Sequence, residues 1–435
     1  MKIALINHGC AKNLVDAELM LGMLDKKGYK ITLDDKEADI VIVNTCSFIH
    51  DAEQESVQSI LEMIESGKRV IVTGCLSQKY NDELKKAIPE LSGMVGTSNL
   101  TDVVKIIEDL EQGKEYESII SDKPHYYYPE ETARQQITVG ASSYLKIGEG
   151  CNYKCGYCII PKLRGPYISR PIENIVKEAK ELVAKGVTEI ILIAQDTSSY
   201  GIDLYGKQAL PELLRELNKI DNLSWIRIMY AYPTQMTDEL IDAIATLDKV
   251  VKYVDIPLQH SHPEVLKRMR RPVMDYTKLV EKIRAKIPNV SVRTTLIVGY
   301  PGETEEEFEH LYNFVKNVKF DRMGAFEYSR EKGTYSYGLK PQIDDKIKKE
   351  RREKLMELQQ KISLENNQKY IGSTLKCIVE GYTDDGVIIL RSEHDAPEID
   401  GVVYATSDRE VIPGDLEYVR ITKVDEYDLF GKVED

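Results

Sequence analysis

The 435-residue sequence has no uninterrupted run of about 18 apolar residues, the length that a membrane-spanning helix needs. The first eight residues turn polar too early to form the apolar region of a signal peptide. Basic residues are in the minority, since 58 Lys and Arg stand against 72 Asp and Glu, for a net charge of −14. These absences predict a cytoplasmic protein, and they disfavour one whose main task is to coat nucleic acid or an anionic membrane.

Cysteine is scarce as well, with seven residues in the whole chain. An odd number of cysteines in a long intracellular chain argues against a disulfide framework and for thiols that bind metal, take part in catalysis or are simply buried. Cys377 lies in an alternating strand pattern near the C-terminus, and we expect it to be ordinary packing. The other six follow a different pattern.

Residues 1–122 alternate short apolar runs with helical patterns. The apolar runs fall at 2–7, 39–44 and 69–73, and they are rich in β-branched residues. Such alternation predicts buried parallel strands in a doubly wound α/β sheet. We treat this segment as the first domain.

Residues 137–343 repeat the strand-then-helix rhythm on a larger scale. Six consecutive units of this kind predict an open, partial (β/α)6 barrel. The strands are expected at 143–147, 189–194, 225–230, 253–256, 292–298 and 322–328. In such folds, ligands collect at the carboxyl ends of the strands, so the chemical groups should be found there.

The last part of the chain divides into two pieces. Residues 344–369 are dense in charge and predict a helical connector. Residues 370–435 hold about five short β-rich runs separated by turn signals such as Asp385-Gly386 and Pro413-Gly414, which predicts a small β-barrel.

Three cysteines lie together just after the first predicted barrel strand. Cys151, Cys155 and Cys158 form a C-x3-C-x2-C motif. Three thiolates on one loop can hold three irons of a cubane cluster and leave the fourth iron open to a substrate. The alternatives are a zinc site, for which no nearby Cys or His supplies the usual fourth ligand, and reduced structural thiols.

The remaining three cysteines are far apart in sequence but equivalent in position. Cys10, Cys46 and Cys75 each follow one of the first three apolar runs by two or three residues. Because parallel strands of one sheet end on the same edge, these thiols should converge. A second iron–sulfur cluster held by three cysteines is the economical interpretation, although a single buried cysteine would need no such explanation.

The C-x3-C-x2-C loop on a partial barrel resembles the radical S-adenosylmethionine (SAM) superfamily. That resemblance implies that SAM chelates the open iron of a 4Fe-4S cluster and is cleaved to a 5′-deoxyadenosyl radical. Tyr157 matches the aromatic position near the adenine, although on the residues alone it could equally be a core aromatic.

Over nearly the whole chain the sequence resembles the methylthiotransferases, which add one further cluster and a terminal TRAM domain to this core. The matching phrases are Gly9-Cys10-Ala11-Lys12-Asn13 with Asp16 and Glu18, Asn44-Thr45-Cys46, Thr73-Gly74-Cys75, and Cys151 to Cys158 with Arg164-Gly165. The family inserts sulfur into a C–H bond and caps it with methyl. The resemblance implies two uses of SAM, one to methylate sulfide on the N-terminal cluster and one to form the radical.

Polar groups at other strand ends suit a SAM pocket. Gln195 and Asp196 close the second barrel strand and could bind an ammonium or a ribose. Gly299 ends the fifth strand, where a missing side chain could let the backbone approach adenine. A helix-capping turn built on Thr304 and Glu307 explains the same stretch without a ligand. His260, after the fourth strand, is most simply a structural hydrogen-bond partner.

The net charge of the C-terminal domain indicates the class of substrate. Residues 370–435 contain six Lys and Arg against sixteen Asp and Glu, a net of −10, whereas the preceding 369 residues carry −4. A domain that grips RNA should be basic, so this one favours a Lys- and Arg-rich protein partner, unless its acidity serves only solubility. The phrases at 194–201 and 253–260 also resemble the RimO-type branch, which modifies an aspartate of ribosomal protein uS12.

Two other functions stay open at this stage. One is a tRNA-adenosine methylthiotransferase of the MiaB type, and the other is an iron–sulfur carrier without chemistry of its own. For the favoured function we expect uS12, an electron donor such as flavodoxin or ferredoxin, and a sulfide source as partners, with no role for a membrane.

Overall fold

The computed structural model describes residues 1–47, 50–131, 134–137 and 140–434. The chain forms two compact units. The first comprises residues 1–139, 148–154 and 158–170, and the second comprises residues 140–147, 155–157 and 171–435. Within the described residues, no helix combines the length and the apolar character that crossing a membrane would require.

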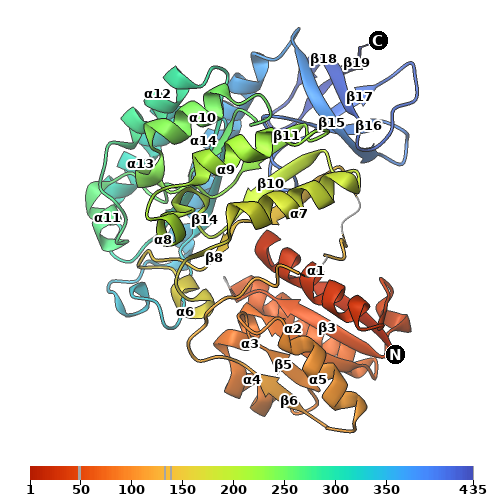
Figure 1. Ribbon diagram of the computed structural model, residues 1–435. Coiled ribbons are helices and arrows are strands. Elements are labelled where there is room, and N and C mark those ends of the chain that lie inside the picture. Colours follow the sequence, from red (N-terminus) through yellow and green to blue (C-terminus); the bar gives the residue numbers. More distant parts are fainter. Residues whose placement is uncertain (48–49, 132–133, 138–139, 435) are drawn as a thin grey trace. The chain divides into compact units, whose positions relative to one another are not determined.

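The first unit is built on a parallel sheet with the strand order β2-β1-β3-β4-β5-β6 (Figure 1). Its strands are β1 (Lys2–Asn7), β2 (Lys30–Ile31), β3 (Ile40–Thr45), β4 (Arg69–Gly74), β5 (Gly93–Val95) and β6 (Glu117–Ile119). Its α-helices are α1 (Ala11–Lys26), α2 (His50–Glu65), α3 (Cys75–Lys79), α4 (Asn81–Ala87), α5 (Asp102–Glu111) and α6 (Ile160–Arg164). Helices α1 and α5 contact each other, and α2 contacts β3 and β4. Every residue of β3 is buried, as expected for a strand covered on both faces.

The second unit contains all six predicted barrel strands. They form two parallel ladders, β7-β10-β11 and β12-β13-β14, and a single bridge between Ile226 and Val250 links β11 to the segment before β12. The strands are β7 (Ser142–Lys146), β10 (Glu189–Ile193), β11 (Trp225–Ile228), β12 (Tyr253–Asp255), β13 (Ser291–Val298) and β14 (Arg322–Glu327). The helices are α7 (Ile172–Ala184), α8 (Ile202–Tyr205), α9 (Leu210–Asn218), α10 (Asp238–Thr246), α11 (Pro263–Arg268), α12 (Tyr276–Lys286) and α13 (Glu305–Val318).

The C-terminal part of this unit is a long helix followed by a closed barrel. Helix α14 (Asp345–Gln368) leads into five strands in the order β15-β16-β17-β19-β18. These are β15 (Thr374–Tyr382), β16 (Ile388–Ser392), β17 (Val403–Thr406), β18 (Leu416–Val424) and β19 (Leu429–Val433). Cys377 is fully buried in the apolar core of this barrel, which confirms its predicted packing role.

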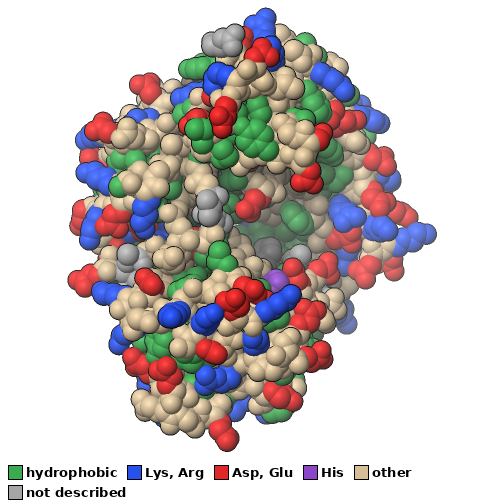
Figure 2. Space-filling view, turned by 90° about the vertical axis from the view of Figure 1, so that its right-hand side faces the viewer, with side chains coloured by type: hydrophobic (Ala, Val, Ile, Leu, Met, Phe, Trp, Pro, Cys, Tyr) green, Lys and Arg blue, Asp and Glu red, His purple; other side chains and the backbone are tan. Residues whose placement is uncertain are grey.

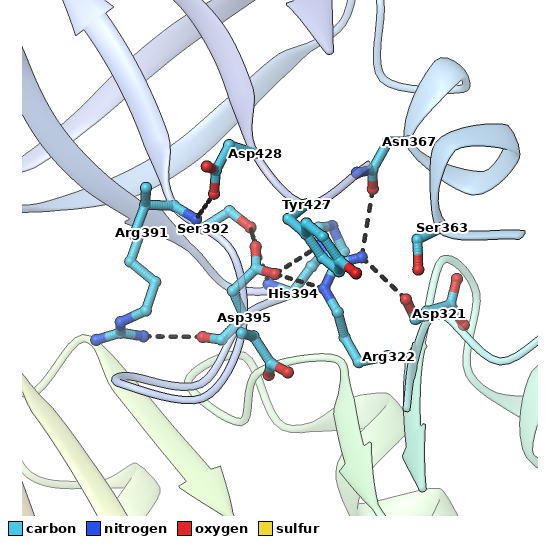
Figure 3. A network of polar contacts seen from close by, with 12 residues as sticks. Asp321, Arg322, Ser363, Asn367, Arg391, Ser392, His394, Asp395, Tyr427 and Asp428 are labelled. Carbon is cyan, nitrogen blue, oxygen red and sulfur yellow. Dashed lines mark hydrogen bonds and ion pairs between the residues drawn. The ribbon is translucent and has the colours of Figure 1, made fainter. Parts of the chain in front are cut away.

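The terminal barrel is seated on the amino ends of the larger barrel's strands. Arg322, the first residue of β14, pairs with Asp395 at 2.6 Å and donates to Asn367 of α14 at 3.3 Å (Figure 3). Tyr253, the first residue of β12, donates to Asp400 at 2.6 Å. The loop that carries Asp395 and Asp400, between β16 and β17, therefore joins the two barrels through buried polar contacts.

Glu189, the first residue of β10, is the centre of a second buried contact between the barrels. It accepts from Arg227 at 2.8 Å and pairs with Arg391 of β16, and all three side chains are at most 1 % exposed. Although burial would raise it, the two guanidinium groups lower the pKa of Glu189 to about 2.

Replacing Glu189 by glutamine is expected to destabilise the protein by about 3–5 kcal/mol at pH 7, because two buried guanidinium groups lose their counter-ion. Since the folded pKa lies below the ordinary value of 4.5, the ion pair stabilises the wild type above pH 4.5 and is lost as pH falls toward 2. Urea unfolding followed by circular dichroism across this range measures both effects. Glu216→Gln is the control, because its surface pair with Lys219 contributes at most about 1 kcal/mol.

Charges of both signs are interspersed over the face shown in Figure 2. Lys and Arg side chains lie among Asp and Glu side chains, and this face is not a continuous surface of one sign.

Candidate active site and cysteine clusters

The three N-terminal cysteines lie at the carboxyl ends of three adjacent strands. β1, β3 and β4 are neighbours in the sheet, and their register aligns Asn7 with Asn44 and Thr45 with Gly74. Cys46 and Cys75 are the first residues after β3 and β4, and Cys10 is the residue before α1. The strands extend one residue further than the sequence predicted at β3 and β4, but the expected shared edge is found.

The backbone around these cysteines leaves no room for larger residues. A Cβ added to Gly9 would lie 2.1 Å from Cβ of Asn13, and one added to Gly74 would lie 2.4 Å from the carbonyl oxygen of Thr45. Gly74 also has φ of +95°, a conformation that favours glycine. Gly74 thus allows the ends of β3 and β4 to approach closely, and Gly9 makes room for the side chain of Asn13 in α1.

Positive groups act on the two outer thiols of this edge. The surrounding atoms partly desolvate Cys10, but Lys12, Arg164 and the backbone N–H groups at the start of α1 lower the pKa of Cys10. Burial raises the pKa of Cys75, and Arg164 opposes that shift. Arg164 donates to the sulfur of Cys75 across 3.6 Å.

The second set of cysteines lies on the loop after β7 and β8 (Gly148–Glu149). Cys151 and Cys158 belong to the first unit, where the Cys151 amide donates to the carbonyl of Gly165 at 3.1 Å. Cys155 belongs to the second unit, where Arg271 approaches its sulfur to 3.9 Å. All three side chains are partly exposed. This loop therefore keeps its thiols within reach of a ligand from solvent.

The donor set fits iron–sulfur ligation. All seven cysteines lie in described residues, and none of them forms a disulfide. No three described His, Cys, Asp or Glu side chains are already gathered in a metal-binding arrangement. What the fold provides is two sets of three thiols, one at a common sheet edge and one on a single loop, and soft thiolate is the ligand that iron–sulfur clusters use.

Tyr157 packs within the second unit. Its ring is partly buried against a small apolar cluster of Val265, Met269, Tyr300 and Tyr328. The neighbouring Gly156 is tightly enclosed, because an added Cβ would lie 2.6 Å from the hydroxyl of Tyr300. This packing fixes the loop that carries Cys155, and the contact of Tyr157 with adenine stays a prediction.

Asp196 follows β10 and caps a short helical turn. Its carboxylate accepts from the amide of Ser198 at 3.0 Å and pairs with the hydroxyls of Ser198 and Ser199. Burial raises the pKa of Asp196, and these hydrogen bonds partly offset the shift. Gln195 is half-buried beside it. Both residues lie at the predicted strand end, and a role in SAM binding is untested.

Gly299 follows β13 with φ of +71°, and an added Cβ would lie 2.3 Å from Cγ of Lys348 in α14. Its amide donates to Glu303 at 3.0 Å. The predicted capping box of Thr304 and Glu307 is present at the start of α13. The packing and capping interpretation of this stretch is thereby observed, while adenine binding by Gly299 stays a prediction.

His260 is fully buried after β12, as its structural interpretation requires. Its Nδ1 accepts from the amide of His262 at 3.0 Å, and its Nε2 lies 3.4 Å from Glu303, which also pairs with Arg351 at 2.6 Å. Burial lowers the pKa of His260. The His260–Glu303 contact ties together the loops that follow β12 and β13.

Three family profiles match the chain. They are the radical SAM superfamily at residues 145–315, the uncharacterized protein family UPF0004 at residues 2–96, and the TRAM domain at residues 371–433. The ribosomal protein uS12 methylthiotransferase RimO of Caldanaerobacter subterraneus is 51% identical over 99% of both chains, and that of Clostridioides difficile is 48% identical over 100% of this chain and 99% of its own. The chain belongs to the uS12 methylthiotransferase family.

Membership of this family makes the protein a radical SAM methylthiotransferase, which uses SAM and an iron–sulfur cluster. The radical SAM methyltransferase TsrM from Kitasatospora setae, solved with cobalamin and a [4Fe-4S] cluster, shares the fold with a TM-score of 0.56 at 14% identity, over 86% of this chain and 80% of its own. The predicted doubly wound sheet, partial barrel and terminal β-barrel are confirmed.

Sequence patterns did not assign roles to Arg164 and Arg271, the two arginines beside cysteine sulfurs. Arg164 lies within a phrase that resembles the family, but nothing in its spacing shows that it is buried beside Cys75. Arg271 lies 116 residues after Cys155 and has no periodic signal at all. Contacts over such separations depend on the topology, and a local motif does not contain them.

Proposed function

We propose that this protein attaches a methylthio group to the β-carbon of an aspartate in ribosomal protein uS12, in two SAM-dependent steps. The observation that carries the proposal is 44–51% identity, over nearly the whole chain, to proteins named uS12 methylthiotransferase. The phrases after the second and fourth barrel strands support the same branch. A tRNA-adenosine methylthiotransferase is the second candidate, and it has less support.

The chain would hold two 4Fe-4S clusters. Cys151, Cys155 and Cys158 would bind the radical SAM cluster. An auxiliary cluster would be bound by Cys10, Cys46 and Cys75, which the sheet brings to one edge. When bound, these groups would supply the radical that removes hydrogen from the target carbon and the sulfur that replaces it.

The chain's own residues would hold SAM and keep the reacting groups in register. Tyr157 on the cysteine loop, and Gln195, Asp196 and Gly299 just beyond the ends of β10 and β13, are the proposed SAM contacts. Arg271, at 8 % exposure over the ring of Tyr232, would place a fixed positive charge beside Cys155. Their rigid packing suits a reaction in which orientation supplies much of the rate.

The TRAM domain is the proposed docking site for uS12. Some of its sixteen carboxylates face inward, because Asp395 and Asp400 pair with arginines of the larger barrel. Among the described residues, the exposed carboxylates are Asp384, Asp385, Glu398, Glu410, Asp415 and Glu434, together with Glu380 and Asp408, which pair with Arg391 and Lys432. Tyr382, Tyr418 and Tyr427 are about half exposed on the same domain and offer cation–π contacts. A basic protein substrate suits this surface better than tRNA.

The reaction also requires an electron donor, such as flavodoxin or ferredoxin, and a source of sulfide. Ribosomal proteins are used in the cytoplasm, so the proposed substrate places the enzyme there. The domain limits that go with this proposal are residues 1–122 for the auxiliary-cluster domain, 137–343 for the radical SAM barrel, 344–369 for the connector and 370–435 for the TRAM domain.

Deleting the gene is expected to remove a methylthio group from uS12 and leave the tRNA unchanged. Mass spectrometry of uS12 and of nucleosides from the parent and deletion strains measures both. A uS12 of unchanged mass would refute the proposed substrate, and loss of a methylthio-adenosine would establish the second candidate instead. Reductive cleavage of SAM by the reconstituted protein separates either enzyme from a simple iron–sulfur carrier.

A further inference from the structure

Arg164 is a buried cation at the edge of the sheet that carries Cys10, Cys46 and Cys75. It ends helix α6 (Ile160–Arg164) and is 3 % exposed. Its guanidinium donates to Asp16 at 2.8 Å, to Asn13 at 2.6 Å and to the sulfur of Cys75 at 3.6 Å, and it lies 3.4 Å from Glu149. All of these residues belong to the first unit.

Asn13 connects the same guanidinium to the other two strand ends. The oxygen of Asn13 that accepts from Arg164 also lies 3.6 Å from the sulfur of Cys10. The nitrogen of Asn13 donates to the carbonyl of Thr45, the residue before Cys46, at 3.0 Å. Arg164 therefore contacts one cysteine directly and is linked to the other two strand ends through a single asparagine.

A structural role alone does not require this arrangement. Burying a guanidinium costs several kcal/mol, and the group stays charged, so carboxylates must balance it. Asp16 and Glu149 supply that balance on one side. The guanidinium also contacts Cys75 and Asn13, where a cluster bound by the cysteine thiolates would add further negative charge. The apolar side chains of Ile159 and Leu163 pack on Cys75.

We infer that Arg164 is a positioning residue for the auxiliary cluster. Its guanidinium donates a hydrogen bond to the Cys75 thiolate and raises the reduction potential of that cluster. The inference rests on the proposed function, because it needs the cluster on Cys10, Cys46 and Cys75. Hydrogen bonds to ligand sulfur and nearby positive charge both favour the more negative, reduced state of an iron–sulfur cluster. Removing Arg164 takes away both effects at once.

The test uses the full chain with Cys151, Cys155 and Cys158 all replaced by alanine, so that only the auxiliary cluster is reconstituted. Arg164→Gln, Arg164→Lys and Arg170→Gln are made in this background. Arg170 is the matched control: it is equally buried in the same unit, pairs with Glu130 at 2.7 Å and stacks on Tyr128. The readouts are iron content, circular dichroism and the midpoint potential from a titration followed by electron paramagnetic resonance.

For Arg164→Gln we expect the ratio of reduced to oxidised cluster at a fixed solution potential to fall at least tenfold, a shift of about 59 mV for a one-electron couple. Arg164→Lys should shift the potential less, because it keeps the charge and loses the forked geometry. Arg170→Gln should leave the potential unchanged.

An unchanged potential in Arg164→Gln with full iron content overturns the inference. If Arg164→Gln loses its iron or its fold, Arg164→Lys decides: a potential equal to that of the parent means that Arg164 only supports the structure. A parent background that binds no iron contradicts the proposed auxiliary cluster itself, which is a different failure from an unchanged potential.

Discussion

Replacing Cys155 by alanine is expected to reduce both SAM cleavage and methylthio transfer to background. Cys155 is one of the three proposed thiolate ligands, and without it the loop would not hold the cluster that would bind SAM and supply the electron for its cleavage. The measurement is 5′-deoxyadenosine formed under a strong reductant, together with the mass of the uS12 product. Cys377→Ala is the matched control, because Cys377 is fully buried in the apolar core of the TRAM barrel and belongs to neither set of proposed ligands.

Iron content distinguishes loss of a cluster from loss of fold in this variant. If the chain holds the two proposed cubanes, Cys155→Ala should keep about four of about eight irons, those of the auxiliary cluster. Cys377→Ala should keep all of them. Normal deoxyadenosine formation by Cys155→Ala would show that the C-x3-C-x2-C loop is not the radical site.

Replacing Cys75 by alanine is expected to abolish methylthio transfer and leave the reductive cleavage of SAM. The two reactions separate because Cys75 belongs to the other set of thiols, on the edge formed by β1, β3 and β4. Mass spectrometry of a uS12 peptide measures the product, and deoxyadenosine measures the radical reaction. Iron should again fall to about four per chain.

Cys10→Ala and Cys46→Ala should give the same phenotype as Cys75→Ala, because the three cysteines are the proposed ligands of one cluster. An intact product yield from any of the three would contradict the two-cluster assignment. A variant that loses SAM cleavage as well would show that the N-terminal edge supports the radical reaction, and the division of roles would then be wrong.

The position of the cysteines could be predicted because it follows from topology. A short β-branched run flanked by helical patterns indicates a buried parallel strand, and parallel strands in one sheet end on one edge. Three cysteines that follow three such runs must therefore be neighbours if the strands are. The observed order β1-β3-β4 satisfies this condition. Strands β2, β5 and β6 have only two or three residues, too few to show a period, and the sequence did not reveal them.

The orientation of charged side chains could not be predicted from the sequence. The count of charged residues in 370–435 assigned Asp395 and Asp400 to an acidic docking surface. In the structure, both carboxylates pair with arginines of the larger barrel. Arg164 presents the same problem, because its partners Asp16 and Asn13 lie about 150 residues away. Composition gives the sign of a domain's charge, and only the packed structure shows which charges are neutralised inside.

The seat of the TRAM domain has a consequence for the size of the substrate. The domain is fastened at the amino ends of the barrel strands, whereas the cysteine loop follows their carboxyl ends. Strands of five to six residues, at about 3.3 Å each, separate these ends by about 17–20 Å. If uS12 docks on the TRAM domain as proposed, we expect it to present its aspartate on a segment that reaches along the barrel. A peptide too short to span that distance could reach the cysteine loop but could not bind the TRAM domain at the same time.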